Sequence, residues 1–165
     1  MPDFNMVIYE EDLIDLEKSL GGLRDEANAR FVFLIDRSGQ QLGFVGDTEA
    51  LDTTSLSSLT AGNVAATEGL AQLIGETNFA SLFHEGKRDN LHITLINQDA
   101  ILLVAFDERS SLGLVRLRVS QASETIGSTL AEISRRQEER RAGDGSGASP
   151  LPEITDEDID SLFSD

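Results

Sequence analysis

The sequence predicts an α/β sandwich, in which a five-stranded, mostly antiparallel sheet carries one helix on one face and two helices on the other. Three observations predict this fold. Long segments at both ends of the domain repeat apolar residues every three or four positions, the period of a helix with one buried side. Five short apolar or alternating runs lie between them, grouped as two and then three. A long, nearly uncharged segment with helix signals separates the two groups. Strands joined by such short turns pair as antiparallel neighbours, which leaves the helices to cover the two faces.

The first helix is predicted over residues 10–27, where three acids occupy the first turn and favour the positive end of the helix dipole. Its apolar stripe consists of Tyr9, Leu13, Leu16, Leu20, Leu23 and Ala27. Residues 30–36 and 40–45 follow as two short runs rich in aromatic and β-branched residues, with Asp36-Arg-Ser-Gly39 between them. This arrangement predicts a hairpin.

The second helix is predicted over residues 53–74, because capping residues such as Asp52 precede it and Gly75 lies at its end. Three strands are then predicted in succession, over residues 79–86, 91–96 and 100–106. The last of these strands is almost wholly apolar, so we expect it in the middle of the sheet.

The closing helix begins near Leu112 and keeps a three-four apolar spacing as far as Ile133. We therefore predict a domain over residues 1–142. Residues 143–152 are rich in Gly, Ser and Pro and are interpreted as a flexible linker. Residues 153–165 are interpreted as an acidic tail with a short amphipathic helix.

Charge restricts the classes of partner. The 165 residues include 30 acids and 13 basic residues, a formal net charge of −17, which repels phosphate backbones and anionic membranes. We expect the partners to be proteins or something cationic, and we expect no nucleic acid. The sequence has no cysteine, and no apolar run approaches the roughly 20 residues of a membrane span. The chain is therefore expected to be cytoplasmic.

The sequence offers little catalytic chemistry. His84 and His92 are the only histidines, and neither a nucleophile elbow nor a phosphate-binding loop accompanies them. We interpret both as ordinary strand or loop residues, and we expect no metal, no cofactor and no active site in the chain itself. An enzyme with an unrecognised site is the alternative, since one sequence does not show which carboxylates lie close together.

The second helix points to a partner, because Glu68 is the only charged residue between Thr53 and Gly75. A helical wheel predicts that the sheet-facing stripe consists of Leu56, Leu59, Thr60, Asn63, Thr67, Leu70 and Ile74. The opposite face would carry Ser58, Ala61, Ala65, Gly69 and Gln72. Small side chains four residues apart let another backbone approach, whereas a solvated face normally collects Lys and Glu.

The alternative is a helix rich in alanine for propensity alone, but glycines 62 and 69 argue against it, since each costs roughly 0.5–1 kcal/mol relative to alanine. We therefore predict a second copy of the chain on this helix and a shared surface for a further protein.

In the tail, Ile159, Leu162 and Phe163 can gather on one side of a short helix that folds on a basic groove. The alternative for the tail is a solubilising acidic segment.

Three segments carry a family resemblance: the neutral helix with its cap (52–75), Phe83-His-Glu-Gly86, and the stretch from Phe106 to Arg118. Together with the order of the elements, they resemble the roadblock (dynein light chain) family. The similarity covers nearly the whole chain and is closest to bacterial members that act with a Ras-like small GTPase. The resemblance implies a roadblock-like fold and a regulator without its own active site.

The resemblance further implies a homodimer whose paired second helices form a platform for one GTP-loaded Ras-like GTPase. The dimer would speed GTP hydrolysis, help to set cell polarity in gliding motility, be enriched at a cell pole and bind further polarity proteins. Carried over by position, Ala65 and Gly69 lie at the contact with the GTPase, and Ala61, Glu68 and Gln72 are their neighbours. The tail, with Ile159, Leu162 and Phe163 as anchors, would bind the GTPase at a separate surface and modulate nucleotide exchange.

The implied mechanism is reorganisation of the GTPase switch segments, not insertion of an arginine from this chain. Three arginines lie in or beside the start of the closing helix and are assigned to local packing and charge balance: Arg109, Arg116 and Arg118. A scaffold that binds the GTPase without changing its hydrolysis is the alternative function.

Overall fold

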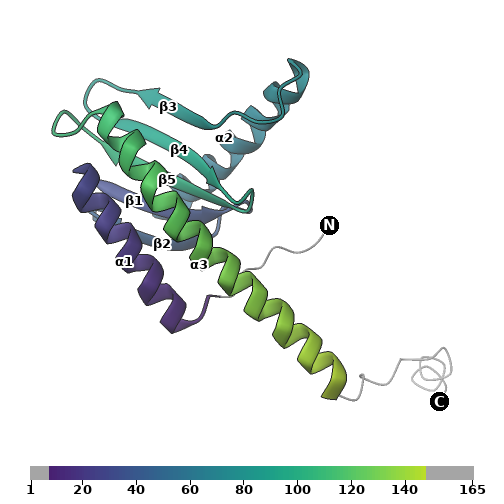
Figure 1. The fold of residues 1–165 in the computed structure, drawn as a ribbon. Helices are drawn as coiled ribbons and strands as arrows, with labels where there is room; N and C mark the ends of the chain where they lie inside the picture. Colours follow the sequence, from purple (N-terminus) through teal and green to yellow (C-terminus); the bar gives the residue numbers. More distant parts are fainter. Residues whose placement is uncertain (1–7, 148–165) are drawn as a thin grey trace, which may run out of the picture. The chain divides into compact units, whose positions relative to one another are not determined.

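The computed structural model describes residues 8–147 (Figure 1). Its elements in chain order are α1 (Glu10–Ala27), β1 (Phe31–Asp36), β2 (Gln41–Gly46), α2 (Thr53–Leu73), β3 (Ser81–Glu85), β4 (Asn90–Ile96), β5 (Ala100–Phe106) and α3 (Leu112–Gly147). Every element predicted for the domain is present. Helix α3 continues to Gly147, so the first residues of the predicted linker are helical. The compact unit that holds the sheet ends at Ile133, and the later residues of α3 belong to a second unit.

The five strands form one antiparallel sheet in the order β2-β1-β5-β4-β3. Strand β5 lies in the middle and is buried along its whole length, which confirms its predicted position. Strand β1 is also fully buried between β2 and β5. Strands β2 and β3 form the two edges, and β3 is mostly exposed.

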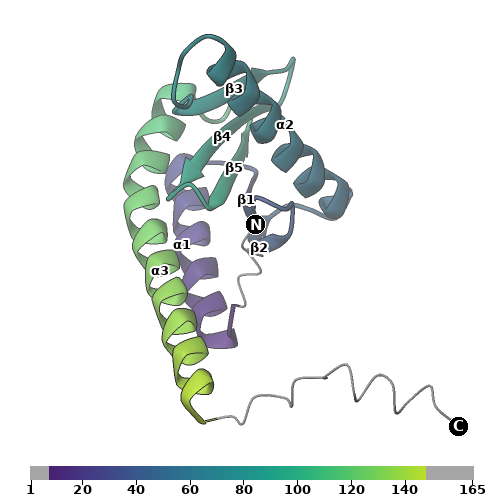
Figure 2. The same cartoon turned by 90° about the vertical axis from the view of Figure 1, so that its right-hand side faces the viewer.

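Two hydrophobic clusters hold the helices on opposite faces of the sheet, as Figure 2 shows. The larger cluster packs α1 and the first part of α3 against one face. Its helical members are Leu16, Leu20, Leu23, Ala27, Val115, Val119, Ile126, Leu130 and Ile133. The sequence periodicity selects all of these positions, but four others that it selects are not buried: Leu112 and Ala122 are partly buried, Leu13 is half-buried and Tyr9 is 47% exposed. The arrangement confirms the predicted placement of α1 and α3 on one face and α2 on the other.

The prediction of which side of α2 lies on the sheet was wrong at several positions. Leu59, Leu70 and Ile74 were expected in the interior but are 73%, 60% and 68% exposed. The buried residues of α2 are Ser57, Thr60, Ala61, Val64 and Ala71. Of the predicted stripe, Thr60 is buried and Leu56 is half-buried against the cluster that also contains Phe31, Phe33 and Ile35.

Hydroxyl groups explain this inverted pattern. Ser57 Oγ donates to the Thr53 carbonyl at 2.8 Å, and Thr60 Oγ1 donates to the Leu56 carbonyl at 2.7 Å. A Ser or Thr that bonds to the carbonyl one turn earlier needs no other partner, so it can be buried like a small apolar residue. Small side chains on the inner side of α2 in turn let this helix lie close to the sheet.

No helix in the described part of the chain is both long enough and apolar enough to span a membrane.

Candidate functional site

Helix α2 has well-defined ends. The Asp52 carboxylate accepts hydrogen bonds from the Ser55 backbone N–H at 3.1 Å and from Ser55 Oγ at 2.6 Å, as expected of an N-cap residue. The Ser55 hydroxyl, together with the backbone N–H, lowers the pKa of Asp52. At the other end Gly75 has φ +80° and the Glu76 N–H returns to the Ala71 carbonyl at 2.8 Å, which ends the helix. These contacts define where α2 begins and ends, and so which residues its exposed surface includes.

The exposed surface of α2 has two sides that differ in chemistry. We call the first the small-residue side; it consists of Ser58, Ala65, Gly69 and Gln72, all exposed. We call the second the apolar side; it consists of Leu59, Leu70, Leu73 and Ile74, which are 60–83% exposed. Four large aliphatic side chains left in water on one helix indicate a surface that another molecule covers.

Three of the five α2 residues predicted at the partner contact are exposed: Ala65, Gly69 and Gln72. Ala61 is only 8% exposed and packs against the sheet with Phe31 and Phe33. Its placement on the outer face was wrong, because the buried side of α2 is made of small residues and not of the large ones. Glu68 is partly exposed and already has a partner within the chain.

Arg37 is that partner, and the sequence reasoning missed it. Its Nη1 donates to Glu68 Oε2 at 3.0 Å and its Nη2 lies 2.8 Å from Glu68 Oε1, so the two groups form a bidentate pair. Arg37 Nε also donates to the backbone carbonyl of Gln98 in the turn between β4 and β5. The sequence showed a turn at Asp36-Arg-Ser-Gly39, but no pattern in it indicated that this turn lies against α2.

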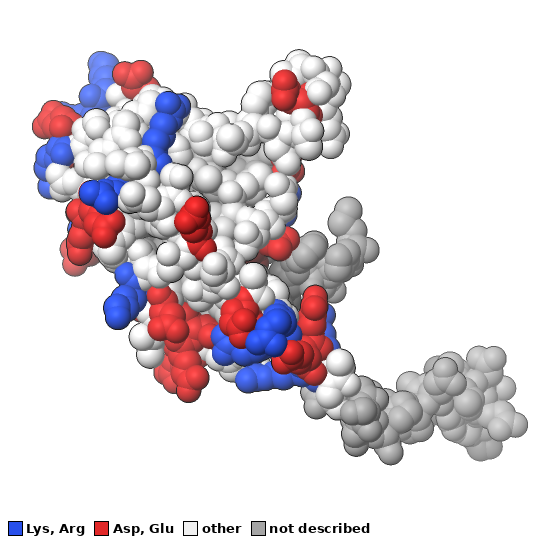
Figure 3. Space-filling view, in the orientation of Figure 1, with Lys and Arg blue, Asp and Glu red and all other residues white. Residues whose placement is uncertain are grey.

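Strand β3 continues the exposed surface beside α2. Phe79, which precedes β3, and Phe83 within it are 39% and 37% exposed. His84 Nε2 lies 3.2 Å from Asn63 Nδ2 and so links β3 to α2. In Figure 3 the area around β3 and the end of α2 is mostly uncharged. This part of the molecule therefore combines apolar side chains, little charge and the free edge of the sheet.

His92 is a structural residue. It is 3% exposed in β4, with Nδ1 3.3 Å from Thr94 Oγ1. Burial, and to a lesser degree the charge of Arg116, lowers its pKa below the usual 6.5. The interpretation of both histidines as strand or loop residues is confirmed, since His84 lies in β3 and His92 in β4. Among the described residues no three His, Cys, Asp or Glu side chains are grouped so that they could hold a metal ion.

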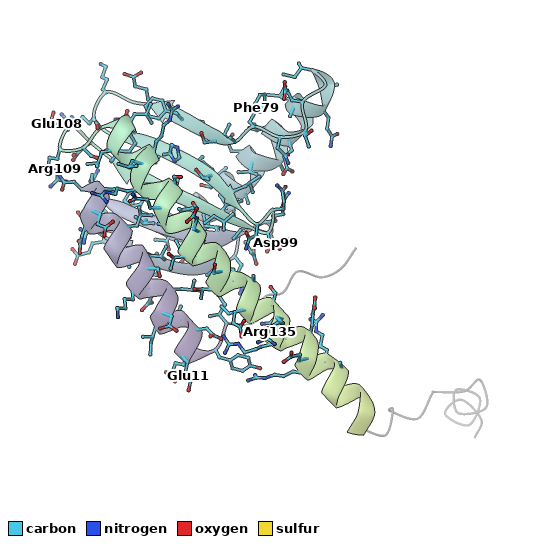
Figure 4. All side chains as sticks on the ribbon, viewed as in Figure 1. Glu11, Phe79, Asp99, Glu108, Arg109 and Arg135 are labelled. Atoms are coloured by element: carbon cyan, nitrogen blue, oxygen red, sulfur yellow. The ribbon has the colours of Figure 1, made fainter. Side chains whose placement is uncertain are left out.

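The arginines near the start of α3 have local contacts. The Arg109 guanidinium bonds to both carboxylate oxygens of Asp107, at 3.1–3.2 Å. The hydrogen bond from Arg109 lowers the pKa of Asp107. Arg118 Nη1 lies 3.6 Å from Glu26 Oε2 and 3.1 Å from Gln121 Oε1. Figure 4 shows Arg109 and Glu108 at the opposite end of the sheet from Phe79 and Asp99. Arg109 is therefore remote from the exposed end of α2.

Comparison with known proteins identifies the family. The Roadblock/LC7 domain matches residues 15–106. MglB from Myxococcus xanthus is 47% identical, covers 77% of this chain and 96% of its own, and superimposes with a TM-score of 0.73. A gliding protein MglB from Thermus thermophilus is 34% identical, covers 78% of this chain and 97% of its own, and has a TM-score of 0.72. An MglB with a tetrameric arrangement is 31% identical, covers 78% of this chain and 97% of its own, and has a TM-score of 0.74. Comparison with the curated proteins found no match. The chain thus belongs to the Roadblock/LC7 family, and within it to the MglB-like proteins.

The predicted tail anchors Ile159, Leu162 and Phe163 lie outside the described residues. Their role stays a prediction from the sequence, as does the contact of Ala65, Gly69 and Gln72 with a partner. The fold of the family is that of a regulatory domain, which agrees with the expectation of a regulator.

Proposed function

We propose that the chain is a GTPase-activating protein for the Ras-like small GTPase MglA in its GTP form. It acts as a homodimer in the cytoplasm, enriched at a cell pole, and controls cell polarity and gliding motility. The observation that carries this proposal is the exposed surface of α2. In a chain with a net charge of −17, this surface holds one charged side chain, Glu68, and an arginine of the same chain neutralises it.

The apolar side of α2 is the surface proposed for the second copy of the chain. Leu59, Leu70 and Ile74 are too exposed to contribute to the fold of one copy, but they gain free energy when another surface covers them. Edge strand β3 lies beside α2 and needs cover as well. An interface made of these two elements supports a symmetric homodimer. The dimer presents two copies of α2 to further partners, including other polarity proteins.

The small-residue side of α2 is the surface proposed for the GTPase. Ala65 and Gly69 have side chains that do not hinder the approach of another backbone. Apart from the adjacent backbone of α2 itself, no atom of the described residues lies within 4 Å of the position where a Cβ on Gly69 would be. Glu68 and Gln72 flank them as polar neighbours. Ala61 lies beneath this surface and supports it from inside, since it is buried against the sheet.

The proposed mechanism is a shift in the conformation of the GTPase. The switch segments of the GTPase have a resting arrangement and a hydrolysis-ready arrangement. A dimer that binds the hydrolysis-ready arrangement more tightly raises the population of that arrangement. No arginine of the chain needs to enter the nucleotide site, because the GTPase's own residues complete the catalytic arrangement. The role of Arg109 in a local pair with Asp107 agrees with this mechanism.

The tail is proposed to bind the GTPase at a separate surface. The support for this role is the spacing of Ile159, Leu162 and Phe163 among acidic residues, which is typical of a short helix that folds on its partner. Removal of residues 150–165 is expected to weaken an effect on nucleotide exchange and to leave the dimer intact. Nucleotide exchange and light scattering, measured with full-length and truncated chains, check both expectations.

A single-turnover assay tests the proposed function. Purified full-length chain is added to GTP-loaded MglA, and phosphate release is followed with and without the chain. We expect a faster release that saturates as the chain concentration rises. Binding with an unchanged rate would replace this proposal by the non-catalytic scaffold that holds the GTPase without stimulating it. No binding at all would refute both functions.

A further inference from the structure

Glu68 occupies a sensitive place on the surface proposed for the GTPase. Ala65, Glu68 and Gln72 are spaced by three and four residues, so they follow one another along the same side of α2. The Glu68 side chain is already three-quarters covered, with 25% of its area exposed. A protein that closes over Ala65 and Gln72 removes water from this carboxylate as well. Loss of water from an unpaired carboxylate opposes binding strongly.

Arg37 compensates this charge before any partner arrives. The guanidinium meets both carboxylate oxygens of Glu68, at 2.8 and 3.0 Å, and donates a further hydrogen bond to the Gln98 carbonyl. A bidentate pair of this kind is stronger and more fixed in direction than a single contact. Two acceptors from this chain hold the guanidinium in place, so it supports α2 and is not a group that extends toward a partner's nucleotide.

The turn that carries Arg37 is built to lie against α2. The Asp36 carboxylate accepts hydrogen bonds from the Ser38 and Gln40 backbone N–H groups, both at 2.9 Å, and so shapes the turn. Gly39 has φ +93°, and a Cβ at this residue would lie 3.1 Å from the Ser58 Cα atom. Glycine therefore allows both the backbone conformation and the close approach of the turn to the helix.

We propose that Arg37 is a positioning residue of the GTPase-binding surface: it neutralises Glu68 and thereby lets the GTPase close over the small-residue side of α2. This inference rests on the proposed function. It assigns to the turn between β1 and β2 a role in recognition. It also predicts that the defect caused by loss of Arg37 comes from the carboxylate left behind.

The test is a double-mutant cycle in the full-length chain: Arg37→Met, Glu68→Gln, and both together. Arg37→Met keeps most of the aliphatic stem and removes the charge. The Kd for GTP-loaded MglA is measured by calorimetry, and phosphate release is measured in parallel. We expect Arg37→Met to weaken binding about tenfold, because it leaves a partly buried carboxylate unpaired. The double variant, which lacks the charge that Arg37 neutralises, should bind as Glu68→Gln does and several-fold more tightly than Arg37→Met.

Arg30→Ala is the matched control. Arg30 pairs with Asp89 at 2.8 Å and is 32% exposed, close to the 33% of Arg37. It precedes β1, whereas Arg37 follows the same strand, so the two pairs lie at opposite ends of β1. The control removes an equivalent charge pair away from the proposed surface and should leave binding of MglA unchanged.

Three results would overturn the inference. A double variant that binds as weakly as Arg37→Met would show that Arg37 acts by its own contact or packing. An Arg37→Met variant that binds as well as the wild type would show that the charge of Glu68 does not matter. Should Arg37→Met fail to fold, a large loss of binding by Glu68→Gln alone would identify Glu68 as a direct contact. A wild-type chain that does not bind MglA refutes the proposed function as well, so the two failures are distinguishable.

Discussion

Replacement of Gly69 separates the stability of α2 from its proposed role in binding. Gly69 lies inside α2, and apart from the adjacent backbone of α2 itself a Cβ built there meets no atom of the described residues within 4 Å. Exchange of a helix-interior glycine for alanine gains about 0.5–1 kcal/mol where nothing obstructs the side chain. Arginine has nearly the helix propensity of alanine. We therefore expect both Gly69→Ala and Gly69→Arg to raise the Tm of the chain, by about 2–4 °C for each kcal/mol in a domain of this size.

Gly69→Arg should weaken the binding of the GTPase even though it raises the Tm. Arginine at position 69 places a long cation where the GTPase is proposed to approach most closely, so Gly69→Arg should weaken binding at least a hundredfold, about 2.7 kcal/mol. Gly69→Ala adds one methyl group and should change binding much less. Thermal unfolding followed by circular dichroism gives the Tm, and calorimetry with GTP-loaded MglA gives the Kd.

Gly22→Arg is the control, because Gly22 is an exposed glycine of α1 with the same open space around its missing Cβ. This variant should bind MglA normally. If Gly69→Arg is folded and binds as tightly as Gly22→Arg, the small-residue side of α2 is not the contact. A lower Tm for Gly69→Ala would refute the claim that this position is open in the free chain. Ala65→Arg should reproduce the loss of binding.

Three further predictions concern the dimer and the fold. Leu70→Glu should separate the homodimer without unfolding the chain, because Leu70 is exposed in one copy; light scattering and circular dichroism check this. Asp52→Ala removes the acceptor for both hydrogen bonds from Ser55 and should lower the Tm. The lowered pKa of Asp52 means that its contribution is present at neutral pH and is lost as pH falls through that lowered pKa. For His92, with a folded pKa below the usual 6.5, the unfolded chain binds the proton first, so stability should fall as pH drops below about 6.5. His92→Gln should remove this part of the pH dependence, and a denaturant titration at several pH values measures it.

The sequence predicted the elements of the fold well, because each has a strong local signal. Helix α1 begins and ends at the predicted residues, and β5 occupies the predicted centre of the sheet. A wholly apolar strand has no side suited to water, so only the middle of a covered sheet accepts it. Helix α3 continues to Gly147, past the end of the predicted domain at residue 142, because the glycines of residues 143–147 do not end it.

The orientation of α2 and the contact with Arg37 were beyond the sequence pattern. Periodicity identifies the apolar side of a helix, but it does not show whether the same chain or another molecule covers that side. In α2 the large residues such as Leu59 and Leu70 face outward, and the hydroxyls of Ser57 and Thr60 are satisfied within the helix. The contact between Arg37 and Glu68 depends on tertiary structure, because the hairpin turn must first lie against the helix.

The scarcity of long side chains on the small-residue side of α2 has an energetic consequence for recognition. Alanine and glycine lose no rotamer freedom on burial, whereas an ordered lysine or glutamine loses up to about 2 kcal/mol. In the proposed complex, Ala65 and Gly69 would therefore have no side-chain rotamers left to order. The side-chain entropy lost on association would fall on the GTPase proposed to dock there.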